Sequence, residues 1–509
     1  MIVTNPSSWA GFPAKACHNC RRRRRRCDRS QPTCHKCSRD GEVCLGYGQL
    51  LRWANVTPAT RARPAPQPLV RGESNAQSGG GGRQTTADTV ATCQDTALVH
   101  NVQPSLIDPL LSGMSERPRF YIHHFANVVC PDLVSVDQLE RNPFRRLILL
   151  VEKYDYLKAI VLATASMHLT VLHRHQGRPS QSDLVYALSA KAKAISLLRA
   201  ALTDAPSTDE AVLLAAIVFF INLDLIDSGR GGWKAHIQAA GTLISSLQRA
   251  QRQLDSSLQP LADAIAADCL TYRIFGSTIG RLDPVPGSVS EHINVLSVLQ
   301  SAEAHSYHCC PPFILQTTMA ASRMFDPEFI EQDDKTRMSV AESLLAQART
   351  FDIERWVYGI RGLSEEDDLP VRVQLASAHR AACCLYILLA VSRGDSKLPD
   401  TWTQPDDVVL EIFNHLSQIP IDHVLLKGTV WPTFLVGAQT DDPLLRSLCL
   451  DRLHAILNTN AWMCPWGYIY TAIEMLQDIW ASKDRVAETA REMNWLQELK
   501  SLANSALIV

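Results

Sequence analysis

Six of the fifteen cysteines in this 509-residue chain lie within one stretch of 28 residues. The stretch reads C-x2-C-x6-C, then a six-residue loop, then C-x2-C-x6-C again, so one short unit is duplicated. These cysteines are Cys17, Cys20, Cys27, Cys34, Cys37 and Cys44. A segment this short cannot bury a core of its own, so it needs cross-links or metal ions to fold. The cysteine pattern therefore constrains the fold more strongly than any other feature of the chain.

The rest of the sequence favours metal ions over disulfides. The chain begins with MIVTNPSSWA, which has neither the basic nor the apolar region of a secretory signal. The longest apolar run, 211–221, is shorter than the roughly 20 residues that a membrane-spanning helix needs. We therefore expect a soluble, intracellular protein with no membrane partner, in a compartment that keeps thiols reduced. The other nine cysteines are scattered, and we expect them to be inert and mostly buried.

Counting ligands gives the number of metal ions. A structural Zn²⁺ binds four ligands in a tetrahedron and prefers thiolates. Two ions have eight ligand positions, which six thiolates fill when two of them bridge both ions. The sequence therefore predicts two Zn²⁺ per chain and a segment that is unfolded without zinc. Two alternatives are a disulfide knot, which reducing conditions disfavour, and a ribbon with one zinc and two idle cysteines, which the duplication disfavours.

Every residue between Cys20 and Cys27 is arginine. A run of like charges is commonly a solvated segment or a nuclear-localisation signal, but metal is expected to fix both ends of this one. Fixed guanidinium groups repel one another unless an anion is near, and they pair with phosphate or guanine. Residues 1–64 hold 13 basic and 3 acidic residues, a net charge of +10, whereas the rest holds 37 and 49, a net of −12. The run therefore indicates a DNA-docking element.

A known family shares this pattern. Residues 15–46 resemble the fungal zinc binuclear cluster (Zn2Cys6) DNA-binding domain. The match follows the motif C-x2-C-R-x-R-[KR]-x-[KR]-C-D and a loop proline, through Arg21, Arg23, Arg24, Arg26, Asp28 and Pro32. The sequence departs from the common family pattern at Arg22 and Arg25, where apolar or uncharged residues are frequent, which implies added non-specific affinity for phosphate.

The resemblance implies roles for individual residues. Cys17 and Cys34 would bridge the two zinc ions, and Arg23 and Arg24 would read the guanines of CGG triplets in the major groove. The other basic residues are expected to hold phosphates of double-stranded DNA: Arg21, Arg22, Arg25, Arg26, Lys15 and Lys36.

Residues 47–108 are predicted to be a flexible linker. They contain several prolines and a run of four glycines at 79–82, and too little apolar surface to offset the entropy of ordering. No heptad repeat follows the cysteines, so the sequence leaves a homodimer open but does not support a zipper-type one.

Residues 109–509 are predicted to form a large all-α domain. The run 211–221 predicts a buried helix, and apolar residues recur at helical spacing elsewhere, whereas strand-like alternation is scarce. The helical stripes are 144–174, 184–202, 338–349, 371–392, 441–458 and 466–504, together with one face formed by Trp233, Ile237, Ala240, Leu243, Ile244 and Leu247. The stretches 141–169, 231–244 and 430–439 resemble the helical regulatory domain that accompanies Zn2Cys6 clusters.

These features predict a small metal-stabilised Zn2Cys6 domain (15–46), a flexible linker (47–108) and a large all-α regulatory domain (109–509). The predicted function is a nuclear, sequence-specific transcription regulator for RNA polymerase II, with double-stranded DNA and a coregulator or the transcription machinery as partners. The family resemblance allows control of a nutrient pathway or of a specialised-metabolite gene cluster. An alternative is a non-specific nucleic-acid tether for a helical protein-interaction domain.

An enzyme is not expected. The chain has no G-x-S-x-G elbow, no G-x-x-x-x-G-K-[ST] phosphate loop and no H-E-x-x-H zinc site. His305, His308, Cys309 and Cys310 lie close together in the sequence, but we expect core residues there rather than metal ligands.

The arginine run predicts binding that depends steeply on salt. If about five phosphates are neutralised, the logarithm of the affinity for duplex DNA should fall against the logarithm of salt concentration with a slope near −4.5. Fluorescence anisotropy titrations at several salt concentrations measure this slope. An affinity independent of salt would contradict the predicted electrostatic contact.

Overall fold

The chain forms two compact units, one within residues 1–99 and one within 100–509, and each is described by itself. The computed structural model describes residues 16–23, 25–30, 34–40, 44, 111–138, 140–203, 210–250, 258–282, 293–364, 367–392, 398–458, 466–487, 494–501 and 506–509. The predicted linker at 47–108 lies outside these residues, and the predicted domain boundaries remain predictions.

The small unit has two short helices, α1 (His18–Arg22) and α2 (His35–Arg39). Each helix begins directly after the first cysteine of one copy of the duplicated unit, and the second cysteine of that copy lies within the helix. The buried cluster among the described residues of this unit consists of cysteines, with no apolar side chain beside them. Sulfur therefore takes the place of an apolar core.

The described part of the large unit is helical and contains no strand. Its longer helices are α3 (Glu116–His124), α6 (Asp155–His175), α7 (Gln181–Thr203), α8 (Glu210–Asp227), α9 (Trp233–Ala250), α10 (Gln259–Ile279), α12 (Val295–Ser301), α13 (Pro312–Ser322), α15 (Asp334–Thr350), α16 (Ile353–Gly359), α17 (Leu369–Val391), α18 (Pro405–Ser417), α19 (Val430–Gln439), α20 (Pro443–Asn458), α21 (Tyr468–Ala487) and α22 (Trp495–Ser501). Shorter pieces are η2 (Phe125–Val129), α4 (Cys130–Asp132), η3 (Pro143–Arg146), α5 (Leu147–Leu150), η5 (Arg323–Phe325), α14 (Pro327–Ile330) and η7 (Val424–Thr429). The predicted all-α class is confirmed.

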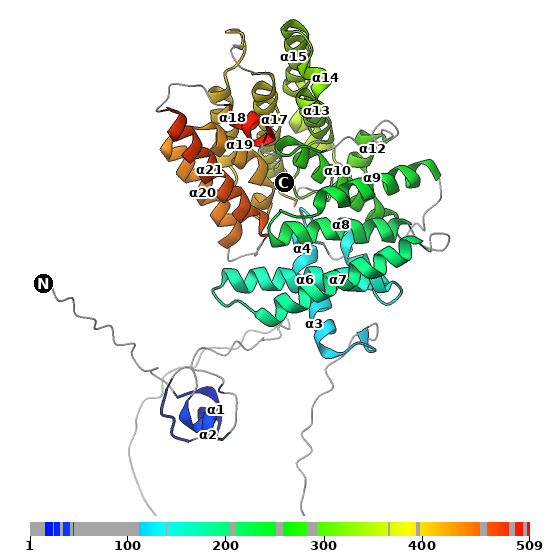
Figure 1. Ribbon diagram of the computed structural model, residues 1–509, viewed down its shortest axis with the longest axis vertical. Coiled ribbons are helices and arrows are strands. Elements are labelled where there is room, and N and C mark those ends of the chain that lie inside the picture. The colour runs from blue at the N-terminus through cyan, green and yellow to red at the C-terminus, as the bar shows by residue number, and fades with distance from the viewer. Residues whose placement is uncertain are drawn as a thin grey trace, which may run out of the picture. The chain divides into compact units, whose positions relative to one another are not determined.

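Helix α8 lies at the centre of the first half of this unit (Figure 1). It is apolar all round, and every residue from 211 to 226 is buried, as expected of a helix that has neighbours on every side. It packs against α6, α9 and α10, and α6 packs in turn against α7. The prediction of a buried helix at 211–221 is confirmed.

Helix α17 has the same role in the second half. It packs against α13, α15, α16, α18 and α19, and α19 continues the packing to α20 and α21. By length and composition α6 and α17 could each cross a membrane, but 83% of the apolar window of each is buried within the described structure. Core packing therefore accounts for their apolar character.

The predicted helical stripes fall on observed helices. On α9, Trp233, Ile237, Ala240 and Ile244 are buried and Leu243 is partly buried, whereas the side chain of Leu247 lies outside the described residues. The stripe at 466–504 includes α21, which is described as far as Ala487, and α22, which is described from Trp495, whereas residues 488–493 lie outside the described residues.

A buried arginine joins segments that are distant in the sequence. Arg372 on α17 is 1% exposed and donates hydrogen bonds to Ser135 Oγ at 2.7 Å and to Cys309 Sγ at 3.3 Å. Ser135 donates from its N–H to the carbonyl of His305 at 2.9 Å and from its hydroxyl to the carbonyl of Ala304 at 3.0 Å. The loop that follows α12 is therefore anchored from two sides.

A buried lysine makes a second polar connection. Lys427, 2% exposed, donates to the carbonyls of Asp132 at 3.0 Å and Pro131 at 3.1 Å. The Asp132 carboxylate lies 3.1 Å from His168 Nε2, and His168 Nδ1 lies 3.1 Å from His124 Nε2. Burial lowers the pKa of His124 to about 3, so this imidazole is neutral at physiological pH. Such buried polar groups are stable in the core because they are hydrogen-bonded.

Candidate metal centre and nucleic-acid interface

The two copies of the cysteine unit fold alike. Cys17 and Cys34 are the residues before α1 and α2, and each sulfur accepts a hydrogen bond from the N–H of the cysteine three residues later. The two N···S distances, Cys20 N to Cys17 Sγ and Cys37 N to Cys34 Sγ, are both 3.4 Å. The C-x2-C spacing therefore places both sulfurs of each pair at the start of one helical turn, on the same side.

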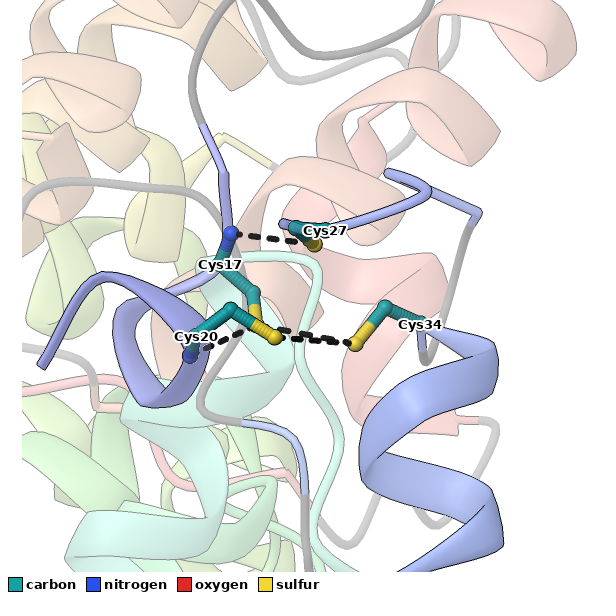
Figure 2. Close-up of side chains that lie close together, drawn as sticks. All are labelled: Cys17, Cys20, Cys27 and Cys34. Carbon is teal, nitrogen blue, oxygen red and sulfur yellow. Dashed lines mark hydrogen bonds between the residues drawn. The ribbon is translucent and has the colours of Figure 1, made fainter. Parts of the chain in front are cut away.

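The sulfurs of the two copies converge on one another, as Figure 2 shows for four of them. Two groups of four form, one from Cys17, Cys20, Cys27 and Cys34 and one from Cys17, Cys34, Cys37 and Cys44, with all sulfurs of a group within 4.8 Å of one another. Cys17 Sγ lies 3.6 Å from Cys34 Sγ and 3.8 Å from Cys37 Sγ. The groups share Cys17 and Cys34, the residues that the family resemblance assigns as bridges.

These distances fit tetrahedral zinc and exclude disulfides. A tetrahedron with zinc–sulfur bonds of about 2.3 Å has sulfur–sulfur edges of about 3.8 Å, whereas a disulfide joins sulfurs at about 2.0 Å. All the described cysteines are free. Burial raises the pKa of the Cys17 thiol far above its ordinary value and that of Cys34 to about 12. A bound cation would stabilise the thiolates of Cys17 and Cys34, which burial otherwise disfavours.

Asp28 connects the two copies across the loop. Its Oδ2 accepts hydrogen bonds from the Ser30 hydroxyl, from the Ser30 N–H at 3.3 Å and from the His35 N–H at 3.1 Å. These bonds from Ser30 and then from His35 hold the pKa of the Asp28 carboxyl well below its usual range. Arg29, next in the chain, has a left-handed backbone with φ 63°, which turns the chain back toward α2. A single carboxylate thus ties the end of the arginine run to the start of α2.

One residue of the arginine run forms an ion pair within the small unit itself. Arg25 forms an ion pair with Asp40 at the end of α2, and the Asp40 side chain raises the pKa of Arg25 above its ordinary value. Arg21, Arg23 and Arg26 are exposed, while Lys36 on α2 is partly exposed. Arg24, Lys15 and the side chain of Arg22 lie outside the described residues.

Within the described residues, groups of potential metal ligands are formed only by the N-terminal cysteines. In the helical unit His308, Cys309 and Cys310 are buried and His305 is partly exposed, in line with the core role expected of them. The scattered cysteines that the structure describes, Cys130, Cys269, Cys309, Cys310, Cys383, Cys384 and Cys449, are also buried, whereas Cys93 and Cys464 lie outside the described residues.

Comparison with known families agrees with this geometry. Residues 15–54 match the fungal Zn(2)-Cys(6) binuclear cluster domain, and residues 119–507 match the fungal specific transcription factor domain. The chain belongs to the fungal-specific transcription factor family. It therefore binds zinc through an N-terminal cysteine cluster, binds DNA and regulates transcription rather than catalysing a reaction.

Two curated relatives cover most of this regulator. The chain is 46% identical over 592 aligned positions to the acriflavine sensitivity control protein acr-2 of Neurospora crassa, with 100% of this chain and 99% of the relative covered. It is 21% identical over 492 positions to the phomenoic acid biosynthesis cluster-specific transcriptional regulator of Leptosphaeria maculans, with 92% and 86% covered. No solved structure matches the chain.

Two contacts of the cluster were not expected from the sequence. Asp28 belongs to the family motif, but nothing in the motif indicates that it bonds to the N–H of His35, seven residues later. The pairing of Arg25 with Asp40 joins residues fifteen positions apart. The duplication offered a signal for both contacts, since it requires the two halves to lie side by side.

We predict that Asp28→Ala speeds the loss of zinc. The substitution removes the carboxylate that accepts from the Ser30 hydroxyl and from the His35 N–H, and leaves the His35 N–H only its contact to Ser30 Oγ at 3.2 Å, so the two halves are held together less firmly. Removing a group that supports metal ligands lowers metal affinity about 10-fold or more. Competition with a coloured chelator measures zinc release. Ser38→Ala is the matched control, because Ser38 is exposed on α2; equal release from both variants would contradict the role of Asp28.

Proposed function

We propose that this regulator holds two zinc ions per chain and uses them to direct its arginine run into the major groove of duplex DNA. One observation supports this most: two groups of four sulfurs share Cys17 and Cys34, an arrangement that suits two tetrahedral ions and six thiolates. The ions would be held by Cys17, Cys20, Cys27, Cys34, Cys37 and Cys44. They would supply most of the folding free energy of a segment that has no apolar core.

Within the proposed interface, Arg23 and Arg24 read guanines at CGG sites, and the remaining basic residues hold phosphates. Guanidinium groups form bidentate hydrogen bonds with guanine O6 and N7, which gives base preference, whereas contacts to phosphate do not depend on sequence. The exposure of Arg21, Arg23 and Arg26 leaves these side chains accessible to duplex DNA. Arg25 would act from the position fixed by its ion pair with Asp40.

We further propose that the chain acts in the nucleus on genes transcribed by RNA polymerase II and controls sensitivity to acriflavine. The full-length similarity to the acriflavine sensitivity control protein supports this assignment over control of a specialised-metabolite cluster or a nutrient pathway. The more distant similarity to a cluster-specific regulator makes a metabolite cluster the second choice. A coregulator or the transcription machinery would contact the helical domain, and homodimerisation is left open.

Selection of binding sites from random duplex DNA, together with zinc analysis of the purified chain, tests this function. We expect enrichment of CGG-containing sites, two zinc ions per chain, and loss of duplex binding when a chelator removes the zinc. Flat selection would favour the alternative of a non-specific nucleic-acid tether. Fewer than two zinc ions, or duplex recognition that survives chelation, would contradict the proposed cluster.

Substitutions in the arginine run separate base reading from phosphate binding. Arg24→Ala should cost about 1–3 kcal/mol on CGG sites and relax base preference, because it removes a bidentate contact to guanine. Arg21→Ala should weaken binding to all duplexes alike and make the salt slope shallower by about 1. Competition of CGG duplexes against scrambled duplexes measures both effects. Identical behaviour of the two variants would overturn the division of roles.

A further inference from the structure

An aromatic hollow with an acidic rim opens on the helical domain, and its lining includes none of the zinc or DNA ligands assigned above. Its volume is about 350 Å³, within the size range of small-molecule sites. It is lined by Glu303, Phe351, Asp352, Arg355, Trp356 and Gly359. Five of these residues come from α16 and the two residues before it, and Glu303 comes from the loop after α12.

Glu303 is the unusual residue of this hollow. It is partly buried, and one carboxylate oxygen, Oε2, accepts a hydrogen bond from Trp356 Nε1 at 3.0 Å. No ion pair reaches Glu303 from the residues that the structure describes. Burial raises the pKa of this carboxyl above its ordinary value. A partly desolvated carboxylate that forms no ion pair is a place where a bound cation would gain free energy.

The aromatic side of the hollow offers flat surfaces at an angle to one another. The ring centroids of Phe351 and Trp356 lie 6.5 Å apart with 54° between the ring planes. Phe351 is itself supported from behind by Phe313, whose ring stacks on it at 5.2 Å and 9°. Such rings attract flat aromatic groups through stacking and cations through the negative face of the ring.

The two segments that line the hollow are held in place by hydrogen bonds and by apolar packing. The neighbours of Glu303 in the chain, Ala304 and His305, are fixed through their carbonyls by Ser135, which Arg372 holds in turn. Helix α16 packs through Ile353 and Val357 on a small apolar cluster separate from the main core. The loop of Glu303 and helix α16 are therefore both anchored to α17, so little conformational entropy would be lost when a ligand binds.

We propose that this hollow binds a planar aromatic cation, with the ring system against Phe351 and Trp356 and the positive charge beside Glu303. Glu303 and Asp352 outweigh Arg355, so the lining carries a net charge of −1. Asp352 also begins α16, since its Oδ1 accepts the Arg355 N–H at 3.0 Å, which leaves Glu303 as the principal partner for the cation. The site would give the regulator a direct way to sense such a compound; that role rests on the proposed control of chemical sensitivity, whereas the binding rests on the hollow alone.

Titration of the zinc-loaded full chain with proflavine, a planar tricyclic cation, tests the site in the absence of DNA. We expect saturable one-to-one binding by calorimetry and by dye anisotropy. Glu303→Gln should weaken it about tenfold, because the substitution removes the charge while the amide oxygen can still accept the Trp356 N–H. Arg355→Gln should tighten it several-fold, because it removes a like charge from the rim.

The matched control is Glu354→Gln, which makes the same change of charge on α16 but outside the lining, and it should leave the affinity unchanged. Anthracene-2-carboxylate, a planar anion, should bind more weakly than proflavine to the wild type. Equal proflavine affinity in the wild type and Glu303→Gln, a preference for the anion, or no saturable binding would overturn the proposal. If Glu303→Gln fails to fold, the exposed Arg355→Gln decides, since unchanged or weaker binding there would overturn it.

A parallel titration with CGG duplex keeps this result separate from the proposed DNA function. Glu303→Gln should bind duplex as the wild type does. A chain that binds proflavine but not duplex would refute the DNA assignment and leave the hollow as a ligand site. A chain that binds duplex but not proflavine would refute the proposed ligand site and leave the DNA assignment intact.

Discussion

The convergence of six sulfurs is the constraint on which the DNA-binding part of the chain depends. About thirty residues cannot bury enough apolar surface to fold, and the buried cluster formed by the described residues of this unit consists of cysteines. Sharing Cys17 and Cys34 between the two sulfur groups also couples the halves, so the position of each helix depends on the other. The arginine run spans one half, and the bonds of Asp28 and Arg25 connect it to the other half. Its shape is therefore a consequence of metal coordination rather than of helix propensity.

The helical domain is stabilised in a different way. Apolar helices such as α8 and α17 supply a large core, and burial of that apolar surface provides the main driving force. The buried cations Arg372 and Lys427 help to align the packed helices, because each of them hydrogen-bonds to groups more than 200 residues earlier in the chain. Such bonds form in only one arrangement of the segments, so they favour a single alignment of helices that apolar contact alone would leave less defined.

The sequence was sufficient to predict the features of the structure that depend on the local spacing of residues. The duplicated cysteine pattern predicted a small unit that folds without an apolar core, and the apolar run at 211–221 predicted a buried helix. It was not sufficient where residues meet across long separations. Glu303 and Trp356 are 53 residues apart, and charged residues such as Arg372 are ordinarily expected at the surface. The hydrogen bond between Glu303 and Trp356 and the burial of Arg372 both follow from how the helices pack. A local pattern of residue types does not predict that packing.

Helix α16 packs on α17 through a small apolar cluster formed by Ile353, Val357, Leu369 and Ala376. Its residues Arg355 and Gly359, which line the hollow, are exposed and take no part in that cluster. Substitutions at the outward positions of this helix could alter the shape and charge of the hollow during evolution while the rest of the fold stays intact. Relatives with the same architecture could in this way diverge in chemical selectivity through one short helix.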